Sequence, residues 1–231
     1  MYSLCKPSQI NQVSTTVHSL IKYAEKINLQ VPELKDNDFQ TVKIAGRTVY
    51  LTKEEIEETM KLVKKEALPA IVILIFSGVR IAELMGLEWK DIDIVNKTIS
   101  ISKQLYRTKK LGKTKSGKSR IVPMHDNVHK ALKMIAQSKG ATWITTGRIF
   151  EQKTKHIVTK ETKKLAKRFG KDVIVHSYRH TCASLLIQAG ESLEKIGHIL
   201  GQSSRSVTAS YAHLCTASVH CTINALPNCS F

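Results

Sequence analysis

Four short clusters in this sequence carry side chains suited to one reaction, the breaking and making of a phosphodiester bond. They are Arg80, Lys115, His176 with Arg179 three residues later, and Tyr211 near the C-terminal end. A tyrosine hydroxyl is a weak nucleophile at neutral pH, so it needs a nearby base and an electrophile such as a phosphate whose charge is neutralised. This set of residues therefore indicates attack by Tyr211 on phosphorus.

The two arginines are suited to hold that phosphate. A guanidinium donates two parallel hydrogen bonds and keeps its charge, so Arg80 and Arg179 can grip the non-bridging oxygens. Donors placed in this way lower the barrier by about 3 to 4 kcal/mol each as charge builds on those oxygens. His176 is then the candidate to take the tyrosine proton, and Lys115 is the candidate to protonate the leaving 5′ oxygen. This chemistry requires no metal ion and no cofactor.

The order and spacing of these residues resemble the tyrosine recombinase (phage integrase) family. The matching motifs run from about Leu51 to Leu214 and read Ser-Gly-Val-Arg80-Ile-Ala-Glu83-Leu, Lys115-Ser-Gly-Lys-Ser-Arg, His176-Ser-Tyr-Arg179-His180-Thr, and Leu-Gly-Gln202-Ser-Ser followed by Ala-Ser-Tyr211-Ala-His-Leu. The resemblance implies that the protein cleaves one strand of DNA through a 3′-phosphotyrosyl bond and religates it to a different 5′ hydroxyl without ATP. It also implies that Glu83 orients Arg80 or His176.

One position departs from the family pattern. The family usually has His or Trp where this sequence has Gln202. Glutamine still donates an amide hydrogen bond to a phosphate oxygen, but it carries no charge and shuttles no proton. We keep Gln202 among the expected catalytic residues, and its identity favours a lower activity.

The strongest electrostatic feature lies between Lys103 and Arg120, where eight basic residues occur without an acidic one. A hairpin of this composition is expected to lie against phosphates, although a solvated lysine-rich loop would have the same composition. Lys115 is singled out because Lys-Ser-Gly matches the family's hairpin lysine, and Lys113 and Lys118 compete with it for that role. The expected DNA contacts in this segment are Lys109, Lys110, Lys113, Lys118 and Arg120.

The same segment also matches the phosphate-binding loop of nucleotide hydrolases, as Gly112-Lys-Thr-Lys-Ser-Gly117-Lys118-Ser119. That loop works only when a helix follows it, because the helix N-terminus cradles the phosphates. Here Arg-Ile-Val-Pro follows and predicts a short strand. We therefore expect no nucleotide as partner.

The composition agrees with a polyanionic partner. A net charge of +17 on 231 residues indicates nucleic acid or an anionic membrane. The most apolar run, Leu68 to Phe76, is shorter than the roughly 20 residues that span a bilayer. The opening residues show no apolar signal region. We expect double-stranded DNA as partner, no membrane, and a cytoplasmic protein that is nucleoid-associated if the host is prokaryotic.

Five cysteines occur at irregular spacing, and three of them lie in the tail with His213 and His220 nearby. Paired Cys-x-x-Cys spacing, which is typical of structural zinc sites, is absent from the sequence. An odd number of cysteines without a signal peptide also argues against a disulfide framework. We predict free thiols and no metal site.

The elements that must position these residues form two parts. An amphipathic helix is expected over 8–28, then a polar connector, and from Thr52 a second unit that opens with a capping box to Glu55. Within it we expect helices over 69–84, 125–138, 160–169, 176–189 and 193–200, with a hairpin and strands between 89 and 123. Cys182, Leu185, Leu186 and Ala189 are expected as the buried stripe of the helix over 176–189.

By resemblance, residues 1–48 are a truncated core-binding segment and linker, and residues 49–231 are the catalytic domain. The fold class implied is α+β, mainly helical, with a small antiparallel β-sheet. Two functions from different classes follow from the residues and the resemblance. One is an active site-specific recombinase or integrase that assembles as a homotetramer on paired DNA sites. The other is a DNA-binding remnant of a mobile-element integrase that has lost turnover with its first domain and the histidine at Gln202. The truncated start and the cysteine-rich tail favour this second function.

Overall fold

The computed structural model describes residues 7–31, 49–106, 108, 110–114, 117, 119–202 and 211. The chain divides into two compact units, Met1–Arg47 and Thr48–Phe231, and each is described here by itself. In the first unit, helix α1 spans Pro7–Lys26, close to the expected bounds. Val17, Ile21 and Ala24 are half-buried, whereas Leu20, which was expected on the same face, is exposed.

The second unit opens with helix α2, Lys53–Leu62, and the expected capping box begins it. The Thr52 hydroxyl accepts a hydrogen bond from the Glu55 backbone N–H at 3.3 Å, and Glu55 accepts one from the Thr52 N–H at 2.8 Å. Two backbone donors that no helical carbonyl satisfies are thus paired at the helix start. Ile56 and Thr59 form the buried face of α2.

The expected helix over 69–84 is wrong as a continuous element. It is divided into α3, Leu68–Ser77, and α4, Ile81–Leu84. Gly78 ends α3 with a left-handed φ of +63°, a conformation that glycine adopts without steric cost. A Cβ at this position would lie 2.5 Å from Leu200 Cδ2 and 3.1 Å from Cys182 Sγ. The break turns the chain so that Arg80 stands at the start of α4.

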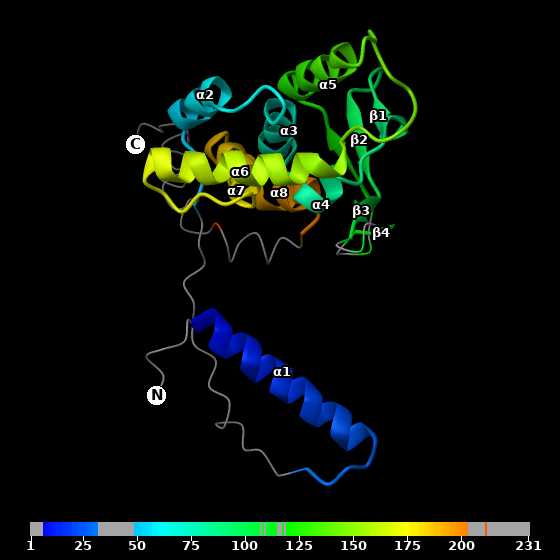
Figure 1. Ribbon diagram of the computed structural model, residues 1–231, viewed down its shortest axis with the longest axis vertical. Coiled ribbons are helices and arrows are strands. Elements are labelled where there is room, and N and C mark those ends of the chain that lie inside the picture. Colours follow the sequence, from blue (N-terminus) through cyan, green and yellow to red (C-terminus); the bar gives the residue numbers. More distant parts are fainter. Residues whose placement is uncertain are drawn as a thin grey trace, which may run out of the picture. The chain divides into compact units, whose positions relative to one another are not determined.

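In the described part of the chain, five short strands form two antiparallel sheets. Strands β1, Ile92–Asp93, β2, Thr98–Ile101, and β5, Arg120–Pro123, form one sheet in the order β1-β2-β5, and β3, Lys103–Leu105, pairs with β4, Leu111–Lys113, in the second. Ile99 faces Val122 in the register, and both side chains are buried, whereas Ile121 points to solvent. The sheets gather at one side of the unit next to α5 (Figure 1).

The remaining helices surround α3. They are α5, Asp126–Ser138, α6, Gln152–Phe169, α7, Ser177–Gln188, and α8, Leu193–Leu200, and a short 3-10 turn covers Trp89–Asp91. Helix α6 begins earlier than the predicted residue 160. Helix α3 is buried along almost its whole length and packs on α5 and α7, so it is the centre of the core. The unit is α+β and mainly helical, as predicted.

Helix α7 is buried almost all round rather than on one stripe. Tyr178, Cys182, Ala183 and Ile187 are buried, whereas Ala189, expected in the stripe, is exposed. The reason is that α7 packs between α3 on one side and α8 on another. The Tyr178 hydroxyl lies 2.9 Å from Thr162 Oγ1, which satisfies it inside the core.

Candidate active site

A buried carboxylate joins two arginines at the start of α4. Glu83 is completely buried, and its Oε1 accepts a hydrogen bond from Arg80 Nη1 at 2.9 Å. Its Oε2 also accepts a hydrogen bond from the backbone N–H of Arg80 at 3.0 Å. From strand β5, Arg120 donates to both carboxylate oxygens, at 3.2 and 2.7 Å. Glu83 therefore contacts Arg80, and the role expected for it, to orient Arg80 or His176, stays a prediction.

The electrostatic state of Glu83 follows from these contacts. Burial alone would raise the pKa of this carboxyl, but the hydrogen bonds and charges of Arg120 and Arg80 outweigh burial and lower the pKa. Glu83 is therefore ionised at neutral pH. A fixed negative charge holds the guanidinium of Arg80, whose side chain keeps 19% of its surface exposed and so faces solvent in part.

Arg120 lies in a different place from the one we expected. It is 7% exposed, and its Nε donates to the Ile199 carbonyl at 2.8 Å in addition to its two bonds to Glu83. The side chain thus ties β5 to α4 and α8 instead of extending along the basic hairpin. We assign Arg120 to the positioning of Glu83, and the DNA contact predicted for it stays a prediction.

Arg179 is anchored in the interior by backbone carbonyls. Its Nη1 donates to the Gly78 carbonyl at 2.7 Å, and its Nη2 donates to the Leu200 carbonyl at 2.5 Å. The side chain is 2% exposed. Each terminal nitrogen carries a second N–H that these two bonds leave for a further acceptor.

The surroundings of Arg179 explain its charge. Burial lowers the pKa of Arg179 to about 10, and the positive charge of Arg80 adds to this while Glu83 opposes it. The guanidinium therefore stays charged at neutral pH. Arg80, Glu83, Arg120 and Arg179 form one electrostatic cluster with an excess of positive charge, which suits a phosphate.

Tyr211 meets this cluster through His180. The hydroxyl lies 2.5 Å from His180 Nδ1, and the two ring centroids are 5.6 Å apart. The tyrosine is 2% exposed and packs against Ala183, Ile196 and Leu200. His176, at the start of α7, is exposed and lies edge-on to the His180 ring, with 4.9 Å between centroids.

The protonation states in this group follow from burial. Burial raises the pKa of Tyr211 to about 12, although the positive charge of Arg179 opposes the change. Burial and then Arg179 lower the pKa of His180 below its usual range. At neutral pH the tyrosine is therefore a phenol and His180 a neutral imidazole, and the pair requires a proton transfer before the tyrosine can act as a nucleophile.

The basic hairpin is exposed where it is described. Lys110 and Lys113 are exposed, and the Tyr106 hydroxyl donates to the Lys113 carbonyl at 3.0 Å across the strand pair. The ring of Tyr106 lies over Gly112, where a Cβ would overlap it. Lys109, Lys115 and Lys118 lie outside the described residues. Strand β5 follows this segment, as expected from Arg-Ile-Val-Pro.

Gln202 directly follows the glycine that ends α8. It is half-buried, and its backbone N–H donates to the Gly197 carbonyl at 2.9 Å. Gly201 has a φ of +63°, and a Cβ there would lie 3.0 Å from Arg120. The turn that carries Gln202 is therefore packed directly on the arginine that holds Glu83.

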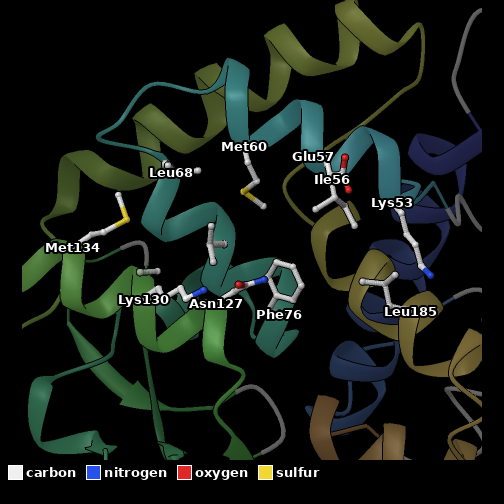
Figure 2. A pocket seen from close by; sticks show the side chains of 12 residues that line it. Lys53, Ile56, Glu57, Met60, Leu68, Phe76, Asn127, Lys130, Met134 and Leu185 are labelled. Atoms are coloured by element: carbon white, nitrogen blue, oxygen red, sulfur yellow. The ribbon is translucent and has the colours of Figure 1, made fainter.

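A separate apolar groove of about 540 Å³ lies between α2, α3, α5 and α7. Figure 2 shows Met60, Leu68, Phe76 and Met134 around it, with Lys53 and Lys130 at its margin. The candidate catalytic side chains do not line this groove. The reaction is therefore expected at the arginine cluster and not in the groove.

Within the described residues, no group of three or more His, Cys, Asp or Glu side chains is arranged to hold a metal ion. The tail that carries Cys215, Cys221 and Cys229 is outside them. None of the helices in the described ranges is both long and apolar enough to cross a membrane.

The sequence model of the phage integrase family matches residues 49–217. The chain belongs to the phage integrase family. This confirms the predicted resemblance, and the matched range contains every residue of the candidate site, from Arg80 to Tyr211.

Curated members of the family are similar to this phage integrase chain over part of their length. A tyrosine recombinase XerC-like protein of Caldanaerobacter subterraneus subsp. tengcongensis is 28% identical over 203 residues, which is 74% of this chain and 52% of the relative. Tyrosine recombinase XerC of Corynebacterium glutamicum is 33% identical over 156 residues, or 63% of this chain and 46% of the relative. The chain thus spans about half the length of these relatives.

Solved structures of integrases and recombinases share the fold. The Tn1549 transposon integrase in complex with transposon right end DNA aligns with a TM-score of 0.76 at 22% identity, covering 96% of this chain and 80% of that one. XerH site-specific recombinase bound to palindromic difH substrate aligns with a TM-score of 0.65 at 15% identity, covering 97% and 73%. These likenesses confirm the predicted fold class, that of a phage integrase catalytic domain.

Of the residues predicted for this phage integrase site, the structure brings Arg80, Glu83, Arg179 and Tyr211 into one electrostatic cluster, and His176 adjoins it through His180. Sequence reasoning gave Arg120 another role, and it did not include His180, which stands in the motif of His176 and Arg179, among the expected catalytic residues. Signals for both were available. Arg120 stands two residues before the inward-facing Val122 and so shares its face of the strand, and His180 stands one helical turn after His176.

Proposed function

We propose that this chain is the catalytic part of a site-specific DNA recombinase that cleaves and rejoins strands through a 3′-phosphotyrosyl intermediate. The observation that carries the proposal is the convergence of Arg80, Arg179 and Tyr211, held by Glu83 and His180. Membership of the family supports the same reaction, and so do the names of its relatives, which are called tyrosine recombinases.

In the proposed mechanism, the remaining N–H groups of Arg80 and Arg179 bind the two non-bridging oxygens of one DNA phosphate. Tyr211 then attacks phosphorus, and the bond to the 5′ oxygen breaks. Lys115 supplies the proton to that leaving oxygen, and His176 takes part in moving the proton that the tyrosine loses. A new 5′ hydroxyl attacks the phosphotyrosyl bond in reverse, so the energy of the original bond is conserved without ATP.

Double-stranded DNA is the proposed partner. A net charge of +17 and the exposed Lys110 and Lys113 support it, because basic side chains on a polyanion release counterions and so favour binding. The similar Tn1549 integrase and XerH structures were solved with DNA. We propose that four copies assemble on two paired DNA sites, as the family resemblance implies.

The proposal is tested by trapping the covalent intermediate. The chain is incubated with a negatively supercoiled plasmid, quenched with detergent, digested with nuclease and protease, and analysed by mass spectrometry for a nucleotide attached to tyrosine. We expect the adduct on Tyr211. Tyr23→Phe, a change at an exposed tyrosine of α1, is the matched control and should leave the adduct in place. Adduct on another residue, or none on the wild-type chain, would contradict the proposal.

A second candidate function is favoured by Gln202. A chain that binds DNA without turnover would need the charged surface but not a proton-carrying side chain at this position. Gln202→His restores the residue type usual in the family. Clearly faster adduct formation by this variant would show that Gln202 limits the rate of the wild-type chain. An unchanged rate would show that glutamine at this position does not limit it.

A further inference from the structure

The Tyr211 hydroxyl meets the ring of His180, the residue that follows Arg179 in α7. The His180 ring lies between the two other rings: its Nδ1 is 2.5 Å from the Tyr211 hydroxyl, and His176 meets it edge-on at an interplanar angle of 87°. A separation of 2.5 Å is at the short end for a hydrogen bond to a hydroxyl. The Tyr211 hydroxyl and His180 Nδ1 are therefore within hydrogen-bonding distance in the DNA-free chain.

The backbone fixes His180 relative to the phosphate-binding arginine. His180 directly follows Arg179 in α7, and Arg179 is held by the carbonyls of Gly78 and Leu200. Thr181 follows His180. Its hydroxyl accepts a hydrogen bond from the Leu51 backbone N–H at 3.0 Å and donates one to the Ser177 carbonyl at 2.9 Å. The anchored side chains on either side of His180 thus fix its place in α7 relative to the arginine.

The protonation state suits a proton acceptor. Among the described residues, Arg179, His176 and Tyr211 are the charged and titratable groups that face His180, and Cys182 stands near the tyrosine. Burial and the Arg179 charge lower the pKa of His180, so the neutral form prevails at neutral pH. A neutral imidazole with its proton on Nε2 has a free lone pair on Nδ1, the atom that meets the hydroxyl.

We propose that His180 holds the Tyr211 hydroxyl in position and accepts its proton at Nδ1 during strand cleavage. The inference rests on the proposed function and deepens it by naming the base. As the tyrosine oxygen bonds to phosphorus, its proton moves to His180. The bond from phosphorus to the 5′ oxygen breaks, and that oxygen takes a proton from Lys115. Religation reverses these steps, and the adjoining exposed His176 exchanges the proton with solvent.

Two substitutions of His180 distinguish its positioning of the Tyr211 hydroxyl from its acceptance of the proton. His180→Ala removes both functions. His180→Asn keeps a hydrogen-bonding group near the place of Nδ1 but does not titrate. His156→Asn, at an exposed histidine of α6, is the matched control. The readout is the single-turnover rate of detergent-trapped adduct on supercoiled plasmid from pH 5 to 9, beside plasmid affinity measured by filter binding.

We expect His180→Ala to slow adduct formation by about 10²- to 10⁴-fold, the usual contribution of a positioned general base, with affinity changed less than threefold. The wild-type rate should fall as the pH drops through the lowered pKa of His180, because protonation removes the acceptor. His180→Asn should recover part of the rate and lose this acidic fall. Wild-type rates and an unchanged pH profile in both variants would overturn the inference.

A wild-type chain that forms no adduct would contradict the proposed function instead. In that case, ¹⁵N NMR of the histidine rings in the DNA-free protein tests the contact between His180 Nδ1 and the Tyr211 hydroxyl. Removing the hydroxyl by Tyr211→Phe should shift the His180 Nδ1 resonance and its titration, while His156 stays unchanged. Identical His180 spectra in wild type and Tyr211→Phe would show that the two groups do not meet, and would overturn the inference.

Discussion

The arginine cluster and the basic hairpin carry the same sign of charge but are built in opposite ways. In the cluster, Arg179 is 2% exposed and bonded to two carbonyls, and Glu83 is fully buried between Arg80 and Arg120. In the hairpin, Lys110 and Lys113 extend from a two-stranded sheet into solvent. Under the proposed function the two regions have different tasks: the cluster would fix the geometry of one phosphate, whereas the hairpin would attract a long polyanion without fixing its geometry.

This comparison predicts a large stability cost for removing the carboxylate of the cluster. Glu83→Gln should lower the free energy of unfolding by about 3 to 5 kcal/mol at pH 7, because it leaves two partly or wholly buried guanidinium groups without their counter-charge. Glu58→Gln is the matched control. Glu58 pairs with Arg168 at the surface, and the loss should stay below about 1 kcal/mol. Denaturant titration measures both.

The pH dependence of this effect follows from the lowered pKa of Glu83. A carboxyl whose folded pKa is below its unfolded pKa contributes stability above the unfolded value and loses it as the pH falls through the folded value. The difference in the free energy of unfolding between wild type and Glu83→Gln should therefore become smaller in acid. A gap that stays constant down to pH 3 would contradict the assigned ion pair.

The second prediction concerns the rate, with stability nearly unaffected. Arg80→Lys keeps the charge but loses the planar fork that can bind Glu83 and a phosphate together. Adduct formation should slow by about 10²- to 10³-fold, the usual loss for one oxyanion donor, while plasmid affinity changes only a few-fold. Arg168→Lys, at an exposed arginine of α6, should leave the rate unchanged. If plasmid affinity fell by the same factor as the rate of adduct formation, Arg80 would contribute to DNA binding only and not to the chemical step.

The smallest expected effect is in the hairpin. Lys110→Ala and Lys113→Ala should each reduce the slope of log affinity against log salt by about 0.9, because each lysine is expected to neutralise one phosphate. Stability should stay within about 0.5 kcal/mol of wild type. Lys195→Ala, at an exposed lysine of α8, is the control. Unchanged slopes would show that the two lysines contact solvent and not DNA, as in the alternative of a solvated lysine-rich loop.

Much of the fold could be predicted because it depends on local signals. The capping box at Thr52, the helix over 193–200 that ends at Gly201 and the strand over 120–123 all depend on neighbouring residues. The continuous helix over 69–84 was wrong because its break depends on tertiary packing. Gly78 could have continued the helix, but the chain turns there, against Leu200 and Cys182.

The candidate site divides in the same way. Family motifs identify Arg80, Arg179 and Tyr211 without any structure. The partners of these residues could not be read from the sequence, because Arg120 meets Glu83 from 37 residues away and His180 meets Tyr211 from 31 residues away. Tertiary packing brings these pairs together, because Arg120 lies on β5 and Glu83 on α4, and His180 lies on α7 and Tyr211 beyond the end of α8.

The most direct test of the central claim is relaxation of a negatively supercoiled plasmid in EDTA without ATP, beside Tyr211→Phe. The proposed mechanism uses side chains of the chain itself and consumes no ATP, so the wild-type chain should yield relaxed topoisomers and protein covalently attached to DNA. The Tyr211→Phe variant should bind the plasmid equally well and yield neither. A plasmid that is bound by the wild-type chain but stays supercoiled and free of adduct would contradict tyrosine-mediated strand transfer.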